Sequence, residues 1–191
     1  MNDRVFLKKK GKIILRLLKR GSWSSQYKSN MPVRDSHPLD VIEFKAELHH
    51  LDYDRPSADE LYLYHEAGEN TEYEESLIWY ESYETLTYSC SLELDYKPEN
   101  RDEVRKLITL VNGHLLTGHF DFIEEDKLLT FRYAMLLHGA VGISSHQCAA
   151  LLDMGPKIYS THHQAFQLVG TTHLSAQDAL EIATFEVHGR A

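Results

Sequence analysis

A strict alternation of apolar and polar residues between positions 85 and 96 constrains this chain more than any other feature. One side of the pattern carries apolar side chains and the other carries polar ones. The apolar set is Leu86, Tyr88, Cys90, Leu92, Leu94 and Tyr96, and the polar set is Thr85, Thr87, Ser89, Ser91, Glu93 and Asp95. A period of two over 12 residues is typical of a strand with one face on the core and one face in water. The sequence therefore predicts an antiparallel sheet with a solvated face.

Further segments of the chain read as strands of the same sheet. "DELYLYHEA" (59–67) alternates leucine with tyrosine, and "SLIWY" (76–80) begins the stretch that leads into the alternating strand. A hairpin follows later: "HFDFIEE" (119–125), a turn near Asp126, then "LLTFRYAMLL" (128–137). In the last segment Leu129, Phe131 and Met135 share the expected core side, which leaves Arg132 on the polar side.

Two helices are predicted before residue 119. Pro38 suits a first helical turn, and the apolar positions that follow it are Val41, Phe44, Ala46 and Leu48. Asn100 is expected to be the N-cap of a second helix, with Glu103 three residues later. The apolar stripe of that helix is Val104, Leu107, Ile108, Val111 and Leu115, and Gly118 is its expected stop.

The last third of the chain reads as helical. Ser144 and Gln147 have the spacing of a capping box, and Gly155-Pro156 is expected to kink or break the helix that they start. Ser175 is expected to cap a last helix. The predicted order is α-β-β-β-α-β-β-α-α, an α+β fold in which an antiparallel sheet carries its helices on one face. Residues 37–191 read as one domain and residues 1–36 as a basic extension.

Charge divides the chain unevenly. Residues 1–34 carry ten Lys/Arg and one acid, whereas the remainder carries ten Lys/Arg and 28 acids. An acidic body is unsuited to phosphate contacts, so nucleic acid is not an expected partner. The amphipathic stretch 5–20 leaves three interpretations open: a poorly ordered tail or a mis-assigned start before Met31, a membrane-surface or partner helix, or a transit peptide.

Several segments of the chain together resemble a known family. In order they are "HPLDVIEF", "DELYLY", "YSCSLELDY", "LVNGHLLTGHFDF", "FRYAMLLHG", "QAFQLVG" and "SAQDALEI", which span roughly residues 37–191. They resemble the YbjN-domain family. The most specific part is the corner G-H-F-D followed by F-R in the next strand. Where the family pattern has a proline before "AFQ", this chain has Gln164. The resemblance implies a fold like that of the type III secretion chaperones, which are small α+β domains that often pair as dimers and bind other proteins. Proteins of the YbjN family are described as bacterial sensory transduction regulators.

The corner also raises the question of a site. His119 and Asp121 share one side of their strand, and Arg132 lies on the polar side of the next strand, so the three are expected to converge near Glu93 and Asp95. Three interpretations remain open: a structural or interface role, recognition of an anion by Arg132, or catalysis. Neither a nucleophile with a partnered base nor a phosphate loop lies nearby, and no catalytic residue is assigned.

The histidines and cysteines suggest no cofactor. The pairs His49-His50 and His162-His163 are adjacent, so their side chains diverge on a helix, and no metal site or cofactor is predicted. A response to pH near neutrality is an alternative use of 12 histidines. Cys90 and Cys148 are expected to be buried free thiols in a reducing cytoplasm.

The sequence thus predicts a non-catalytic, cytoplasmic regulatory or chaperone-like domain. We expect it to be a homodimer that binds a protein segment or small ligand through the face or edge of its sheet. An anion-binding sensor or enzyme centred on Arg132 is one alternative. A membrane-peripheral protein docked by residues 5–20 is the other.

Overall fold

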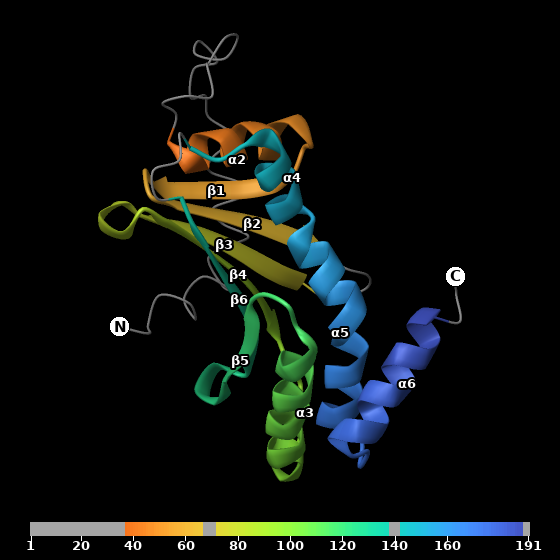
Figure 1. Cartoon of the computed structure of the whole chain (residues 1–191). Coiled ribbons are helices and arrows are strands. Elements are labelled where there is room, and N and C mark those ends of the chain that lie inside the picture. The colour runs from red at the N-terminus through yellow and green to blue at the C-terminus, as the bar shows by residue number, and fades with distance from the viewer. Residues whose placement is uncertain (1–36, 67–71, 138–141, 189–191) are drawn as a thin grey trace. The chain divides into compact units, whose positions relative to one another are not determined.

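The computed structural model describes residues 37–66, 72–137 and 142–188. These residues form one six-stranded sheet in the order β1-β2-β3-β4-β6-β5, in which every neighbouring pair is antiparallel (Figure 1). The strands are β1 (Asp52–Ser57), β2 (Glu60–Glu66), β3 (Glu72–Tyr80), β4 (Thr85–Glu93), β5 (His119–Ile123) and β6 (Leu128–Leu136). The predicted α+β class with an antiparallel sheet is confirmed.

Five α-helices accompany the sheet in the described residues. They are α2 (Pro38–Leu48), α3 (Arg101–His114), α4 (Ser145–Leu152), α5 (Met154–Thr171) and α6 (Ala176–His188). Helix α2 packs on β2 and β3, α3 packs beside β5, and α5 packs against α3 and α6. Figure 1 shows α4 and α5 following one another along the sheet.

Strand β4 is the strand that the alternation predicts. Leu86, Tyr88, Cys90 and Leu92 are buried, and the residues between them are only half-buried. Because β4 pairs with β3 on one side and β6 on the other, its apolar face lies at the centre of the core. The face of the sheet that the described helices do not cover is called the open face below.

Strand β1 is absent from the predicted order. It is an edge strand that contains Pro56, and its register with β2 shifts between Asp54 and Ser57. Proline is tolerated at edges and bulges because no ladder hydrogen bond is lost there. The sequence pattern gave no strand at this position because the segment lacks alternating apolar residues.

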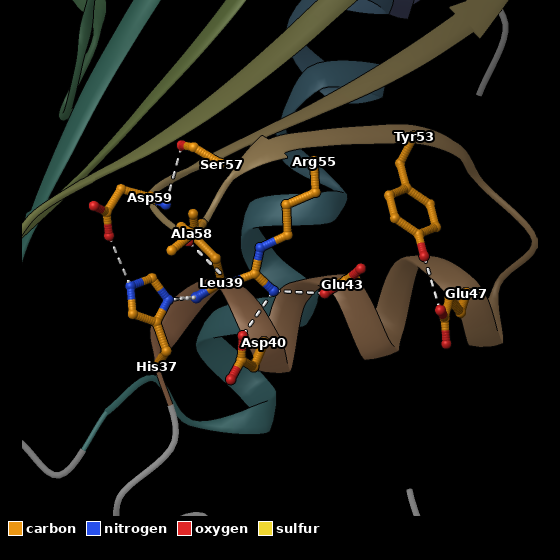
Figure 2. A network of polar contacts seen from close by, with 10 residues as sticks. All are labelled: His37, Leu39, Asp40, Glu43, Glu47, Tyr53, Arg55, Ser57, Ala58 and Asp59. Atoms are coloured by element: carbon orange, nitrogen blue, oxygen red, sulfur yellow. Dashed lines mark hydrogen bonds and ion pairs between the residues drawn. The ribbon is translucent and has the colours of Figure 1, made fainter. Parts of the chain in front are cut away.

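Side chains join β1 to α2, as Figure 2 shows. Arg55 Nη1 lies 2.7 Å from Asp40 Oδ1 and 2.5 Å from Glu43 Oε2, and Arg55 Nη2 donates to the carbonyl of Ala58 at 2.9 Å. The Tyr53 hydroxyl donates to Glu47 at 2.7 Å. These bonds hold a polar edge strand in place where few apolar contacts are available.

His37 ends the same network at the start of α2. Its Nδ1 accepts from the Leu39 N–H at 3.3 Å, and its Nε2 lies 3.1 Å from Asp59 Oδ1 (Figure 2). A neutral ring with its proton on Nε2 satisfies both contacts. The histidine therefore caps the helix and also ties it to the turn between β1 and β2.

The helical third of the chain breaks at a different residue from the one predicted. Helix α4 ends at Leu152 and α5 begins at Met154, so the break lies at Asp153. Pro156 instead falls in the first turn of α5, where its missing N–H leaves no helical bond unmade. The segment is therefore two helices, and α5 continues unbroken through Gln164.

The cap predictions have mixed outcomes. Ser144 and Gln147 form the predicted capping box, and Ser175 Oγ accepts from the Asp178 N–H at 3.2 Å. Asn100 precedes α3 as predicted, but its side chain makes no bond to that helix. In α2, Leu39, Ile42 and Ala46 form the buried face, whereas the predicted Phe44 and Leu48 are exposed.

Some expectations concern residues that the structure does not describe. The basic extension 1–36, with its tail, membrane-surface and transit-peptide interpretations, lies outside the described residues. Among the helices that are described, none combines the length and the apolar character that a bilayer crossing needs.

Candidate functional site

Three of the five predicted site residues meet on the open face. His119 of β5 pairs in register with Arg132 of β6, and Arg132 Nε lies 3.6 Å from Asp121 Oδ2. The side chains of Arg132 and Asp121 are 47% and 51% exposed. An exposed pair at this separation contributes little to stability, because water screens the charges. The arrangement is an open polar surface.

The other two predicted residues lie apart from that group. Glu93 is the last residue of β4 and pairs with Leu128, four residues along β6 from Arg132. Four residues of strand correspond to roughly 13 Å, which exceeds ion-pair distance. Asp95 follows the end of β4 and is exposed. The predicted five-residue cluster is therefore a three-residue cluster with two outlying acids.

Hydrogen bonds between side chains and backbone groups hold the corner that joins α3 to β5. The Asn112 side chain donates to the Phe120 carbonyl at 3.0 Å and accepts from the Phe120 N–H at 2.7 Å. Asp121 Oδ1 accepts from the Phe122 N–H at 2.9 Å. Because β5 is an edge strand, these side chains occupy backbone groups that would otherwise attract another strand.

Gly118 completes this corner. Its φ is +72°, and an added Cβ would lie 2.7 Å from the carbonyl oxygen of Arg132 and would overlap the Phe131 ring. Only glycine fits such a position without strain. The motif that carries the family resemblance thus specifies a turn and a closed strand edge, and Asn112 is the member of it that sequence reasoning missed.

A second feature of the open face is an exposed apolar strip, here defined as Ile78, Tyr80, Ala134 and Leu136 with Tyr83 in the adjoining turn. Tyr80 and Leu136 both pair with Thr85, one from each side of β4. Tyr80 is 46% exposed, Leu136 is 69% exposed and Tyr83 is 74% exposed. The strip lies on the same strand face as Arg132, at the end of the sheet near the β3–β4 turn.

A third feature is a buried polar cluster on the core face. Glu75 is 0% exposed, and His65 Nε2 lies 2.9 Å from its Oε1. The hydroxyl of buried Tyr88 is next to it on β4, and Gly155 of α5 covers it. Sequence reasoning did not identify this cluster. The missed signal is that Glu75 falls between Tyr73 and Leu77 on the apolar side of β3.

Burial controls the acid–base properties of this cluster. Desolvation raises the pKa of Glu75 above its ordinary value, and the nearby His65 and Tyr88 partly oppose that rise. Desolvation and the charge of Glu75 also raise the pKa of Tyr88 and of Cys90. At neutral pH the hydroxyl of Tyr88 and the thiol of Cys90 are therefore protonated.

The histidine pairs do not form a metal centre within the described residues, where no group of three potential ligands converges. The His162 ring packs edge-on against Phe120 at 5.2 Å, and the His163 ring stacks on Tyr159 at 4.4 Å. Burial lowers the pKa of both histidines. Cys90 and Cys148 are both free and buried, as predicted.

The chain was compared with solved structures, curated proteins and family models. The crystal structure of YbjN from E. coli, titled "a putative transcription regulator", is 12% identical to this chain and has a TM-score of 0.47. The similarity covers 82% of this chain and 97% of that one. No curated protein matches the chain. The family model described as "YbjN: Putative bacterial sensory transduction regulator" matches residues 38–168, which is more than half of the sequence. The chain therefore belongs to the YbjN family.

Proposed function

We propose that this domain is a non-catalytic regulatory module that binds another protein through the exposed apolar strip on its open face. The observation that carries the proposal is the exposure of Tyr80, Tyr83 and Leu136 at one end of a sheet. Large apolar side chains that gather on a surface mark interaction sites more often than isolated ones do. The family description, a sensory transduction regulator, agrees with a binding role.

The chemistry of the strip favours a protein partner. Tyrosine and arginine are enriched among the residues that dominate binding energy, and here Tyr80 and Arg132 lie on one face with Leu136. An apolar centre with a polar rim is the usual composition of a protein interface. A partner that presents apolar side chains, with an acid opposite Arg132, fits this surface.

The proposal can be tested with charge substitutions in the full chain. Leu136→Asp is compared with Leu116→Asp, because Leu116 is 100% exposed and lies outside the strip in the α3–β5 corner. Wild type and each variant are immobilised separately and incubated with bacterial lysate. Each captured protein is then purified and titrated against wild type and against both variants. We expect Leu136→Asp to weaken the affinity for a purified partner by at least about 30-fold, the factor for a 2 kcal/mol contact. The control retains wild-type affinity.

Three outcomes separate the alternatives. If light scattering shows a wild-type dimer that Leu136→Asp dissociates, the protein partner is a second copy of the chain. Equal affinity in wild type and Leu136→Asp would refute a role for the strip. A partner or small anion lost with Arg132→Ala but not with Leu136→Asp would favour the anion-binding alternative.

A further inference from the structure

The first turn of α5 lies directly on the carboxylate of Glu75. A Cβ added to Gly155 would overlap Glu75 Oε1 and would lie 2.8 Å from the Tyr88 hydroxyl. Glycine therefore allows the helix to approach the sheet closely at this point. The consequence is that water does not reach Glu75, although a carboxylate is normally among the residues least often buried.

The cluster is not fully hydrogen-bonded. His65 Nε2 is at ion-pair distance from Glu75, but it is not aligned for a hydrogen bond. Among the described residues, neither carboxylate oxygen nor the Tyr88 hydroxyl has an aligned partner. Buried polar atoms without partners are uncommon and cost about 1 to 3 kcal/mol each. Packing α5 over Glu75 therefore costs free energy, and the amount depends on the charge of the cluster.

An aromatic stack connects the cluster to α5. The His65 ring stacks on Tyr73 at 4.6 Å, and Tyr73 stacks on Tyr159 of α5 at 5.2 Å. Tyr159 in turn stacks on His163, one turn further along the helix. Movement of the first half of α5 would separate Tyr159 from Tyr73 and would expose Glu75 at the same time.

We propose that Glu75 and His65 form a proton-controlled latch that holds the first half of α5 on the sheet. While the pair shares a proton, its net charge is zero and the helix lies flat. When that proton is lost, a negative charge is left in the core, and a conformation in which residues 154–163 lift from the sheet and admit water becomes more populated. The latch is a regulatory device separate from the apolar strip.

The direction of the pH dependence follows from the cited shifts. A carboxyl group with a raised folded-state pKa binds its proton more tightly when α5 is closed, so closure is favoured below that pKa and weakened as pH rises through it. The titratable groups that face Glu75 are His65 of β2, Tyr73 of β3, and Tyr88 and Cys90 of β4. From α5, Tyr159 stacks on Tyr73, and His163 stacks on Tyr159.

One histidine in the stack acts in the opposite direction. Burial lowers the pKa of His163, so protonation of this ring on acidification favours opening below its ordinary value near 6.5. The two effects are separable because only one of them requires Glu75. The difference between wild type and Glu75→Gln therefore reports on the latch, since the effect of His163 is present in both proteins.

The test is amide hydrogen exchange of the full chain between pH 5 and 9, read as opening constants after correction for intrinsic exchange at each pH. For peptides within 157–163 we expect the opening constant to rise with pH, by at most about tenfold per unit. Peptides within 164–171 are the internal reference. Glu75→Gln should abolish the rise, whereas Glu74→Gln, on the opposite face of β3, should leave it unchanged.

A second variant keeps the proposal testable if Glu75→Gln does not fold. His65→Gln retains a side-chain N–H but cannot carry a second proton, so we expect the rise to move to lower pH. A rise of equal size and position in wild type, Glu75→Gln and His65→Gln would overturn the latch. So would a wild-type opening constant that is independent of pH.

Discussion

The two ends of α5 meet the rest of the domain in opposite ways. At the C-terminal end, the buried side chain of Asn100 donates to the Gly170 carbonyl at 2.9 Å and to the Thr172 carbonyl at 2.5 Å. A third hydrogen bond at this end is donated by the Lys97 N–H to the Gly170 carbonyl at 3.0 Å. At the N-terminal end, the helix rests on Glu75, whose oxygens have no aligned hydrogen-bond partner in the part of the chain that the structure describes.

This difference shows that one end of a helix can be held at every pH while the stability of the other end depends on a titrating group. The amide donors and carbonyl acceptors at the Asn100 end are uncharged at every pH between about 4 and 9, so their hydrogen bonds hold this end under all physiological conditions. The Glu75 end contains a group whose protonation changes in or near that range. The first half of α5 is therefore the half whose stability conditions can alter.

The largest expected effect concerns the C-terminal end. Asn100→Ala removes two donated hydrogen bonds and leaves the buried Gly170 carbonyl without one of its partners, so we expect a loss of about 2 to 4 kcal/mol in the free energy of unfolding. Urea unfolding at pH 7 measures it. Asn112→Ala is the comparator, because Asn112 is only half-buried and water can replace its bonds to Phe120. Equal losses in both variants would show that the Asn100 end is not specially held.

An intermediate effect is expected at the N-terminal end. Gly155→Ala forces Glu75 and Tyr88 to move, which we expect to cost about 1 to 3 kcal/mol despite the higher helix propensity of alanine. Adding Glu75→Ala makes room for the new methyl group. The double variant should therefore show a favourable coupling of about 1 kcal/mol or more in a urea-unfolding cycle. Additive losses would mean that Gly155 and Glu75 are not in contact.

The smallest effect has the opposite sign and calibrates the previous one. An added Cβ at Gly113, in α3, meets no atom within 4 Å. Gly113→Ala should therefore gain about 0.5 to 1 kcal/mol, because alanine loses less backbone freedom than glycine on folding. The same urea experiment measures it. A loss of stability in Gly113→Ala would show that the higher helix propensity of alanine, which the Gly155 comparison assumes, does not hold in this protein.

Local patterns predicted much of this fold. The alternation in β4, the apolar stripe of α3 and the capping box at Ser144 all appear in the structure, because each depends on residues within a few positions of one another. Strand β1 was missed for the same reason. Its conformation depends on Arg55 and Tyr53 reaching α2, which no local pattern reports.

The candidate sites divide in the same way. Parity along two strands was enough to place His119, Asp121 and Arg132 on one face, but the ladder register separated Glu93 from them. The role of Asn100 also depended on distant residues. Its side chain was expected to cap α3 and instead binds α5, some 70 residues later in the chain.

By itself, the sequence determined the fold class, the solvated sheet face and most helix boundaries, because hydrophobic periodicity and capping are local properties. The tertiary structure decided that Glu75 is buried beside His65 and that Gly155 covers it. Residues so far apart in sequence meet only through strand register and helix packing. Whether a carboxylate on the apolar side of a strand is covered or reaches water depends on what packs over it, and here that is the first turn of α5.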